Sequence, residues 1–271
     1  MSDTRPHEVE MGFWDHFDAL RKVLFKIAFV VVAFGVAAFI CMPWMFEHII
    51  LAPCKADFPL YTMLESLSGS IFNSEPGTEE FMVEPVSLQL TSQFFIHMSS
   101  SCWAAVVFGF PFIIYYLWTF VAPGLYEREK RGAKKVFFFG NLMFYLGLLC
   151  GYFLVFPLAV RFLSTYNLSP SINAMVSLES YMDNFYTILL LMGMVFELPL
   201  VAWALGRIGL LKRSFFKKYR RHAIVALLIL AAIITPTGDP FSLLAVFVPL
   251  YALWEFSSRI VPKPEPEDLP A

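Results

Sequence analysis

The distribution of Lys and Arg along the chain limits its possible folds more than any other feature. Long apolar stretches separate the basic clusters, and 18 of the 20 Lys and Arg residues fall on one side of those stretches. Only Lys55 and Arg161 fall in the alternate gaps. Because short loops rich in Lys and Arg stay on the cytoplasmic side of a membrane, the pattern predicts a multi-pass membrane protein with both termini in the cytoplasm.

The composition excludes an ordinary soluble domain. The chain is 58% hydrophobic and contains 30 Phe residues, whereas soluble domains average about 45–50% apolar residues. The first 22 residues lack the basic start and short apolar core of a cleavable signal peptide, so we expect them in the mature protein. The four cysteines are dispersed without a CxxC motif, so neither a disulfide nor a metal site is expected.

Six apolar stretches predict an all-α integral membrane protein with six transmembrane helices. Crossing a hydrocarbon layer of about 30 Å takes about 20 helical residues, and a helix satisfies its own backbone hydrogen bonds there. We expect a six-helix domain over 24–257, preceded by a cytoplasmic amphipathic helix over 1–23 and followed by a disordered cytoplasmic tail over 258–271. The expected spans are roughly 24–45, 94–119, 136–157, 184–206, 223–235 and 241–257.

Two connections between the spans have unusual properties. The segment 46–92 is a long acidic outer loop, in which scattered apolar residues predict a cap of short helices. The fifth span is short, because the 13 residues of 223–235 cover only about 20 Å as a helix. The Pro-rich turn 236–240 that follows it should therefore lie below the outer surface. Such a hairpin either thins the bilayer locally or leaves a funnel above itself.

A second helix-start signal follows the second span and contains a candidate binding residue. Glu127 has Arg131 four residues on as a helical partner. Glu129 has Gly132 and Ala133 at the corresponding positions, so its carboxylate has no intrahelical base at this spacing. A carboxylate of this kind can bind a guanidinium group through two parallel hydrogen bonds. The alternative reading is a solvated surface acid close to the neighbouring basic residues.

One carboxyl group falls at membrane depth. Glu197 lies mid-way along the fourth predicted span, where a charged side chain costs roughly 2.5–3.5 kcal/mol unless it is paired or faces water. It should face the protein interior or a groove, either as a packing acid or as a polar point for a translocating peptide or partner helix. Pro199 lies two residues on and should bend this helix, because proline cannot donate a backbone hydrogen bond.

Motifs for other functions are missing from the sequence. There is no phosphate-binding GxxxxGK[ST] loop, no HExxH and no GxSxG. The five histidines are scattered, and no Ser–His or paired-carboxylate arrangement stands out. We therefore expect neither a nucleotide motor nor an enzyme, no cofactor and no nucleic-acid partner.

The motifs of the chain resemble those of the TatC family, the multi-span subunit of the twin-arginine protein translocase. The family's pattern Trp-x-Phe-x-x-Pro-Gly-Leu-Tyr-x-x-Glu matches from Trp118 to Glu129, and Phe-Glu-x-Pro matches from Phe196 to Pro199. Thr-Pro-x-x-Asp matches from Thr235 to Asp239, and the outer Ala-Pro matches Ala52-Pro53. These motifs occur in the family's order over nearly all of the chain.

This resemblance implies a fold and a function. The fold would be a curved, glove-like wall of six helices with a concave groove, in the cytoplasmic (inner) membrane. The function would be to bind signal peptides with two adjacent arginines and to begin the export of folded cargo, driven by the proton-motive force. The implied partners are TatA- and TatB-type single-span subunits, twin-arginine signal peptides, membrane lipid and further copies of the chain in the complex.

The resemblance also implies site residues. Glu129 would be the main carboxylate for the arginines. The family's second acid aligns with Ala19, so its place would be taken by Asp18, by Asp15 or by neither. Further signal-peptide residues would be Phe120, Pro123, Leu125 and Tyr126, and groove or translocation residues would be Pro53, Glu197, Pro236 and Asp239. The rival functions are a six-helix membrane-embedded enzyme and a small-molecule transporter.

Overall fold

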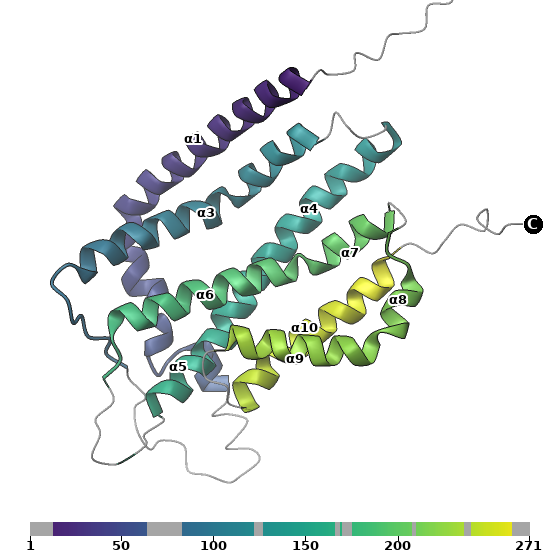
Figure 1. Cartoon of the computed structure of the whole chain (residues 1–271). Helices are drawn as coiled ribbons and strands as arrows, with labels where there is room; N and C mark the ends of the chain where they lie inside the picture. The colour runs from purple at the N-terminus through teal and green to yellow at the C-terminus, as the bar shows by residue number, and fades with distance from the viewer. Residues whose placement is uncertain are drawn as a thin grey trace, which may run out of the picture.

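The computed structural model of the chain is helical, and its helices form a curved wall (Figure 1). The structure describes residues 13–63, 83–121, 127–165, 169, 175–207, 210–235 and 240–261. Five helical segments of these residues are long and apolar enough to cross a membrane. Within the described residues the only β-pairing is an isolated parallel bridge between Val86 and Ser177.

The first helix joins the predicted amphipathic segment to the first span. Helix α1 (Phe13–Met45) continues without a break through residue 23, where the interfacial segment was expected to end. A π-turn, η1 (Phe46–Ile50), and a 3-10 turn, η2 (Ala52–Cys54), then begin the outer segment. A helical turn over 59–63 follows, in agreement with the expected short helices.

The second and third spans are an antiparallel pair. Helix α3 (Ser92–Val121) is followed by α4 (Glu127–Cys150), so the predicted helix start after Pro123-Gly124 is confirmed. A second π-turn, η4 (Gly151–Val155), leads into α5 (Phe156–Thr165). The third span was expected to end at residue 157, but the helix continues to Thr165, where α5 packs against both α6 and η2.

The fourth span breaks where the sequence predicts a bend. Helix α6 (Leu178–Phe196) ends one residue before Glu197, and α7 (Leu198–Arg207) begins one residue after it. The backbone N–H of Glu197 donates to the carbonyl oxygen of Met194 at 3.1 Å, a tightened last turn. Pro199 lies in the first turn of α7, where its missing N–H is tolerated.

The last spans are an antiparallel hairpin. A short helix, α8 (Arg213–Lys218), precedes α9 (Arg220–Ile234), and α10 (Pro240–Ile260) returns beside α9. The 15 residues of α9 span about 22 Å, less than the hydrocarbon thickness of about 30 Å. Helix α10 continues three residues beyond the predicted end at 257, and residues 262–271 lie outside the described part.

The core lies between α4 and α6, while α1 and α3 pack along each other at one edge of the wall. Glycines permit the close approach of α4 and α6: a Cβ atom on Gly147 would lie 2.5 Å from the carbonyl oxygen of Met192. Close backbone contact of this kind is typical of helix pairs in membranes. Large apolar side chains point outward, with Phe29 75% and Ile40 73% exposed, as expected for a lipid-facing surface.

Candidate functional site at the basic end

The two ends of the wall differ in charge. Helices α1 and α4 begin, and α3, α7 and α10 end, at the same end of the molecule (Figure 1). The described residues of the basic clusters fall on these helix ends, on α8 and at the start of α9, and we call this the basic end. Lys55 follows η2 and Arg161 lies on α5, so both occupy the opposite end.

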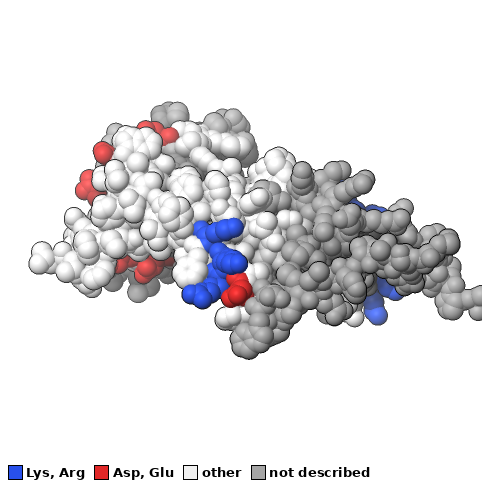
Figure 2. Space-filling model, turned by 90° about the horizontal axis from the view of Figure 1, so that it is seen from above, with Lys and Arg blue, Asp and Glu red and all other residues white. Residues whose placement is uncertain are grey.

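At the basic end, α1 presents charged side chains beside a wide uncharged surface. Figure 2 shows a compact group of Lys and Arg side chains with an acidic side chain next to it. Asp18 is exposed, and it makes no ion pair with Arg21 or Lys22, the basic residues three and four positions on. Lys26 instead lies over the ring of Tyr116 on α3, with its Nζ 5.7 Å from the ring centroid.

Three of the predicted signal-peptide residues, Glu129, Phe120 and Asp18, have backbone positions at one end of the wall. Glu129 is the third residue of α4, and Phe120 is the last residue but one of α3. An acid in the first turn of a helix is stabilised by the helix dipole. Asp18 on α1 lies at the same end (Figure 1). Pro123, Leu125 and Tyr126 lie outside the described residues, as do the side chains of 121–137, and Asp15 is described by its backbone alone.

Glu197 faces α4 at the break between α6 and α7. Its Oε1 is buried and has no hydrogen-bond partner among the described residues. A Cβ atom added to Gly140 of α4 would lie 3.5 Å from Oε2 of Glu197 and 2.9 Å from a methyl group of Leu200. The missing side chain of Gly140 therefore leaves the space into which this carboxyl group points, as the expectation of an inward-facing acid requires.

Pro53 is part of the outer segment, close in sequence to Lys55 at the end of the wall opposite to the basic end. It is buried in η2, and its carbonyl oxygen accepts a hydrogen bond of 2.9 Å from the hydroxyl of Tyr61. The same hydroxyl lies 3.0 Å from the carbonyl oxygen of Pro157 on α5, so its single proton is shared between the two carbonyl oxygens. Pro53 thus belongs to the contact between the outer segment and α5. Pro236 and Asp239, the other predicted groove residues, lie outside the described part of the chain.

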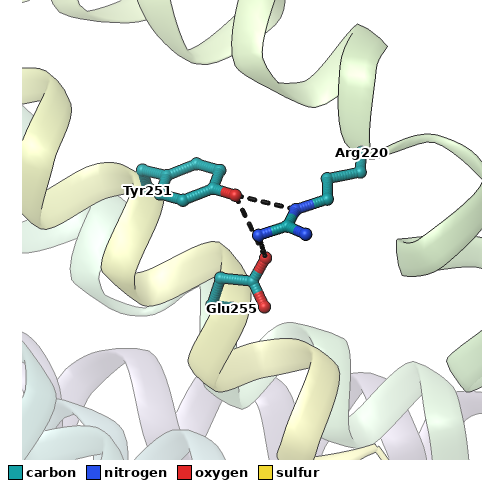
Figure 3. A network of polar contacts seen from close by, with 3 residues as sticks. All are labelled: Arg220, Tyr251 and Glu255. Atoms are coloured by element: carbon teal, nitrogen blue, oxygen red, sulfur yellow. Dashed lines mark hydrogen bonds and ion pairs between the residues drawn. The ribbon is translucent and has the colours of Figure 1, made fainter.

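A polar network joins α9 and α10, and sequence reasoning did not anticipate it (Figure 3). Nη2 of Arg220 lies 2.8 Å from Oε1 of Glu255, and Nε donates to the hydroxyl of Tyr251 at 2.8 Å. That hydroxyl donates to Glu255 at 3.2 Å. The hydrogen bond with Tyr251, followed by the charge of Glu255, raises the pKa of Arg220. The available signal was the spacing of four residues between Tyr251 and Glu255, which places both on one face of a helix.

An apolar cavity of about 530 Å³ lies between α1, α3, α4 and α6. Two of the tyrosine hydroxyls on its walls are paired within the protein: that of Tyr145 donates to the carbonyl oxygen of Val107, and that of Tyr186 pairs with Ser100. The cavity is therefore suited to apolar groups and offers them no free hydroxyl from these two tyrosines.

Comparison with known proteins assigns the family. The family model described as "Sec-independent protein translocase protein (TatC)" matches residues 15–249. A TatC of Blattabacterium sp. subsp. Periplaneta americana is 34% identical over 257 residues, which are 93% of this chain and 95% of that protein. A TatC of Deinococcus radiodurans is 37% identical over 194 residues, 70% of this chain and 72% of that protein.

A solved structure agrees with the sequence comparisons. The crystal structure of the twin-arginine translocase receptor TatC in DDM superposes with a TM-score of 0.69 at 26% identity, and the match covers 91% of this chain and 99% of that one. These comparisons support neither a membrane-embedded enzyme nor a small-molecule transporter. With its wall of apolar helices and its family motifs in order, the chain belongs to the TatC family and is a multi-pass membrane protein that serves as a core component of the twin-arginine translocase.

Proposed function

We propose that this TatC-family chain is a non-enzymatic receptor for signal peptides, and that Glu129 at the basic end binds the two adjacent arginines. The supporting observation is that the start of α1, the end of α3 and the start of α4 lie at one end of the wall, with Glu129 in the first turn of α4. Two guanidinium groups would meet a carboxylate beside the low-dielectric bilayer, where a charge-assisted bidentate pair is stronger than in water.

Asp18 is the second carboxylate in this proposal. Its side chain is exposed on α1 and makes no ion pair with Arg21 or Lys22, so the exposed carboxylate is accessible to an arginine of the peptide. Phe120, Pro123, Leu125 and Tyr126 flank the peptide at the connection between α3 and α4. Asp15 is the competing candidate, and substitution of each acid separately distinguishes them.

The apolar part of the signal peptide then follows the concave face of the wall. Glu197 points toward Gly140 within this wall and supplies a polar contact for the peptide or for a partner helix. Pro53, Pro236 and Asp239 belong to the translocation path in this proposal. Single-span subunits of the TatA and TatB kind and further copies of the chain complete the complex in the cytoplasmic membrane. Both termini are cytoplasmic, and the proton-motive force drives the export of folded cargo.

The test is the binding of a photocrosslinkable signal peptide to the chain in membranes. Glu129→Gln should weaken crosslinking of an Arg-Arg peptide about 10- to 150-fold, the equivalent of one hydrogen-bonded charge pair. A Lys-Lys peptide should bind weakly to both proteins, because lysine lacks the planar fork of arginine. Glu127→Gln in the same helical turn is the matched control and should bind like the unaltered chain, since Arg131 is its expected partner.

Equal crosslinking by the Glu129→Gln and Glu127→Gln variants would contradict the assignment. Asp18→Asn and Asp15→Asn, made in the same way, should separate the two candidates for the second carboxylate. We expect the loss for Asp18→Asn, and a loss confined to Asp15→Asn would transfer the role to that residue.

A further inference from the structure

Proline interrupts the backbone hydrogen bonding of α1 within the membrane, and a histidine from α3 replaces the missing bond. Pro43 lies inside α1 and has no N–H to donate to the carbonyl oxygen of Phe39, four residues before it. Nε2 of His97 lies 2.9 Å from that oxygen, and the imidazole ring stacks on Phe39 with the ring centroids 4.1 Å apart. A carbonyl oxygen can only accept, so Nε2 of His97 carries the proton.

The same arrangement recurs between α3 and α4. Pro111 lies inside α3, and the carbonyl oxygen that loses its backbone donor is that of Val107, four residues before it. The hydroxyl of Tyr145 on α4 donates to this oxygen at 2.9 Å. The two cases involve different helices and different donor side chains, and in each the donor comes from the adjacent helix.

A third case lies in the outer segment. Cys54 and Lys55 donate to the carbonyl oxygens three residues before them, so in this register Pro53 would have served Ile50. The hydroxyl of Tyr181 on α6 donates to the carbonyl oxygen of Ile50 at 2.5 Å. The neighbouring carbonyl of Ile49, which an α-helical register would assign to Pro53, accepts from Tyr152 at 2.7 Å.

A backbone carbonyl without a donor is unfavourable in hydrocarbon because no water is there to replace it. We propose that Tyr145 and His97 are positioning residues of the wall: they hold α4 and α3 against their neighbouring helices by donating to the carbonyl oxygens of Val107 on α3 and Phe39 on α1, which Pro111 and Pro43 leave without a backbone donor. Proline leaves the carbonyl oxygen open, and the donor on the next helix fixes how the two helices lie together.

The bond between Tyr145 and Val107 borders the apolar cavity between α1, α3, α4 and α6, while His97 and Phe39 lie outside its lining. Val107, Tyr145, Ile49, Tyr152 and Ile50 all line it. The bond of Tyr145 therefore helps to set the shape of this cavity and keeps the Tyr145 hydroxyl and the Val107 carbonyl paired. If Tyr145 only packed, its contribution to stability would come from its ring and would not depend on Pro111. If its hydroxyl replaces the missing backbone donor, that contribution should vanish when Pro111 is replaced by a residue with an N–H.

A double-mutant cycle between Tyr145 and Pro111 tests the proposal. Tyr145→Phe removes only the hydroxyl and should lower the folding equilibrium constant roughly 3- to 20-fold, the range measured for interhelical hydrogen bonds in membranes. In a Pro111→Ala background the new N–H serves Val107, so the same substitution should change the constant less than about 2-fold. Reversible unfolding of the full chain in mixed micelles measures all four proteins.

Tyr186→Phe is the matched control, because its hydroxyl pairs with the hydroxyl of Ser100 at 2.5 Å and with no proline-freed carbonyl. Its loss should be the same in both backgrounds. Equal losses for Tyr145→Phe in the two backgrounds would overturn the proposal, as would a Tyr186→Phe loss that also vanished with Pro111→Ala. If Tyr145→Phe alone does not fold, recovery of folded protein in the double variant supports the proposal and failure to recover overturns it.

The pair on α1 and α3 supplies an independent cycle. His97→Leu should lower the folding equilibrium constant by a similar factor, and Pro43→Ala should remove most of that loss. His97→Gln keeps an N–H donor and should retain more stability than His97→Leu. Equal losses for the two substitutions at His97, unchanged by Pro43→Ala, would restrict the role of this side chain to packing.

Discussion

The close approach of α4 and α6 makes a single methyl group at Gly147 disruptive. A Cβ atom there would lie 2.5 Å from the carbonyl oxygen of Met192, 2.8 Å from the Cβ of Phe196 and 3.0 Å from the Cα of Gly193. Two of these three atoms are backbone atoms, so no side-chain rotation relieves the contact. Gly147→Ala must therefore move the two helices apart.

The size of the effect follows from two opposing terms. Overpacking of a close-packed interface costs about 1–3 kcal/mol, while Ala in place of Gly inside a helix contributes about 1 kcal/mol in the opposite direction. Gly35→Ala on α1 isolates the second term, because a Cβ atom there would meet the nearest atom, the Cβ of Ala105, at an ordinary 3.6 Å. The Gly147→Ala protein should be less stable than the Gly35→Ala protein by about 1–3 kcal/mol.

Thermal unfolding of the two purified variants in the same detergent measures this difference. Each kcal/mol should separate the midpoints by about 2–4 °C for a chain of this size class. The unaltered chain should fall between the variants or close to Gly147→Ala, because the propensity gain offsets part of the overpacking. A Gly147→Ala midpoint equal to or above that of Gly35→Ala would refute the reasoning and show that the interface can absorb a methyl group without separating.

Three further predictions concern polar groups. Tyr61→Phe removes the donor for two carbonyl oxygens and should destabilise the chain by about 1–3 kcal/mol, seen as a lower unfolding midpoint; an unchanged midpoint would contradict this. Glu197→Gln removes a carboxyl group with a buried oxygen that has no hydrogen-bond partner among the described residues, so the unfolding midpoint should hold or rise while export of a twin-arginine reporter falls. A lower midpoint would contradict this expectation. Glu255→Gln weakens a partly exposed ion pair with Arg220 and should lower the free energy of unfolding by less than about 1 kcal/mol, with a smaller effect at high salt. A larger loss of stability that does not depend on salt would contradict this expectation.

Features that depend on local sequence were predictable. The spans follow from apolar length, and the start of α4 follows from the Pro-Gly break before it. The interruption at Glu197 follows from Pro199, which cannot continue the hydrogen bonding of α6. The shortness of α9 was also visible, because the count of apolar residues between the basic cluster and the turn sets it.

Features that depend on which helices meet were not predictable from one sequence. In the sequence Tyr145 is one of many aromatic residues in apolar spans, and its role becomes visible only because the structure places its hydroxyl beside the carbonyl oxygen of Val107 on α3. In the sequence Gly147 is a residue of low helix propensity, and its value for packing becomes visible only from the close approach of α6. For the candidate site, the sequence identified Glu129 by its lack of a helical partner and by family motifs, and its role stays a prediction. The place of Asp18 on α1 follows from helical continuity from residue 13 onward.

The network of Arg220, Tyr251 and Glu255 has a mechanical consequence. Helices α9 and α10 are fastened by it at the basic end, and the short stretch of chain between them ties them at the other. Two connections at opposite ends limit the sliding of α9 along α10, so the two helices should move together. Because α10 also packs along α7, a displacement of this pair should carry α7 with it.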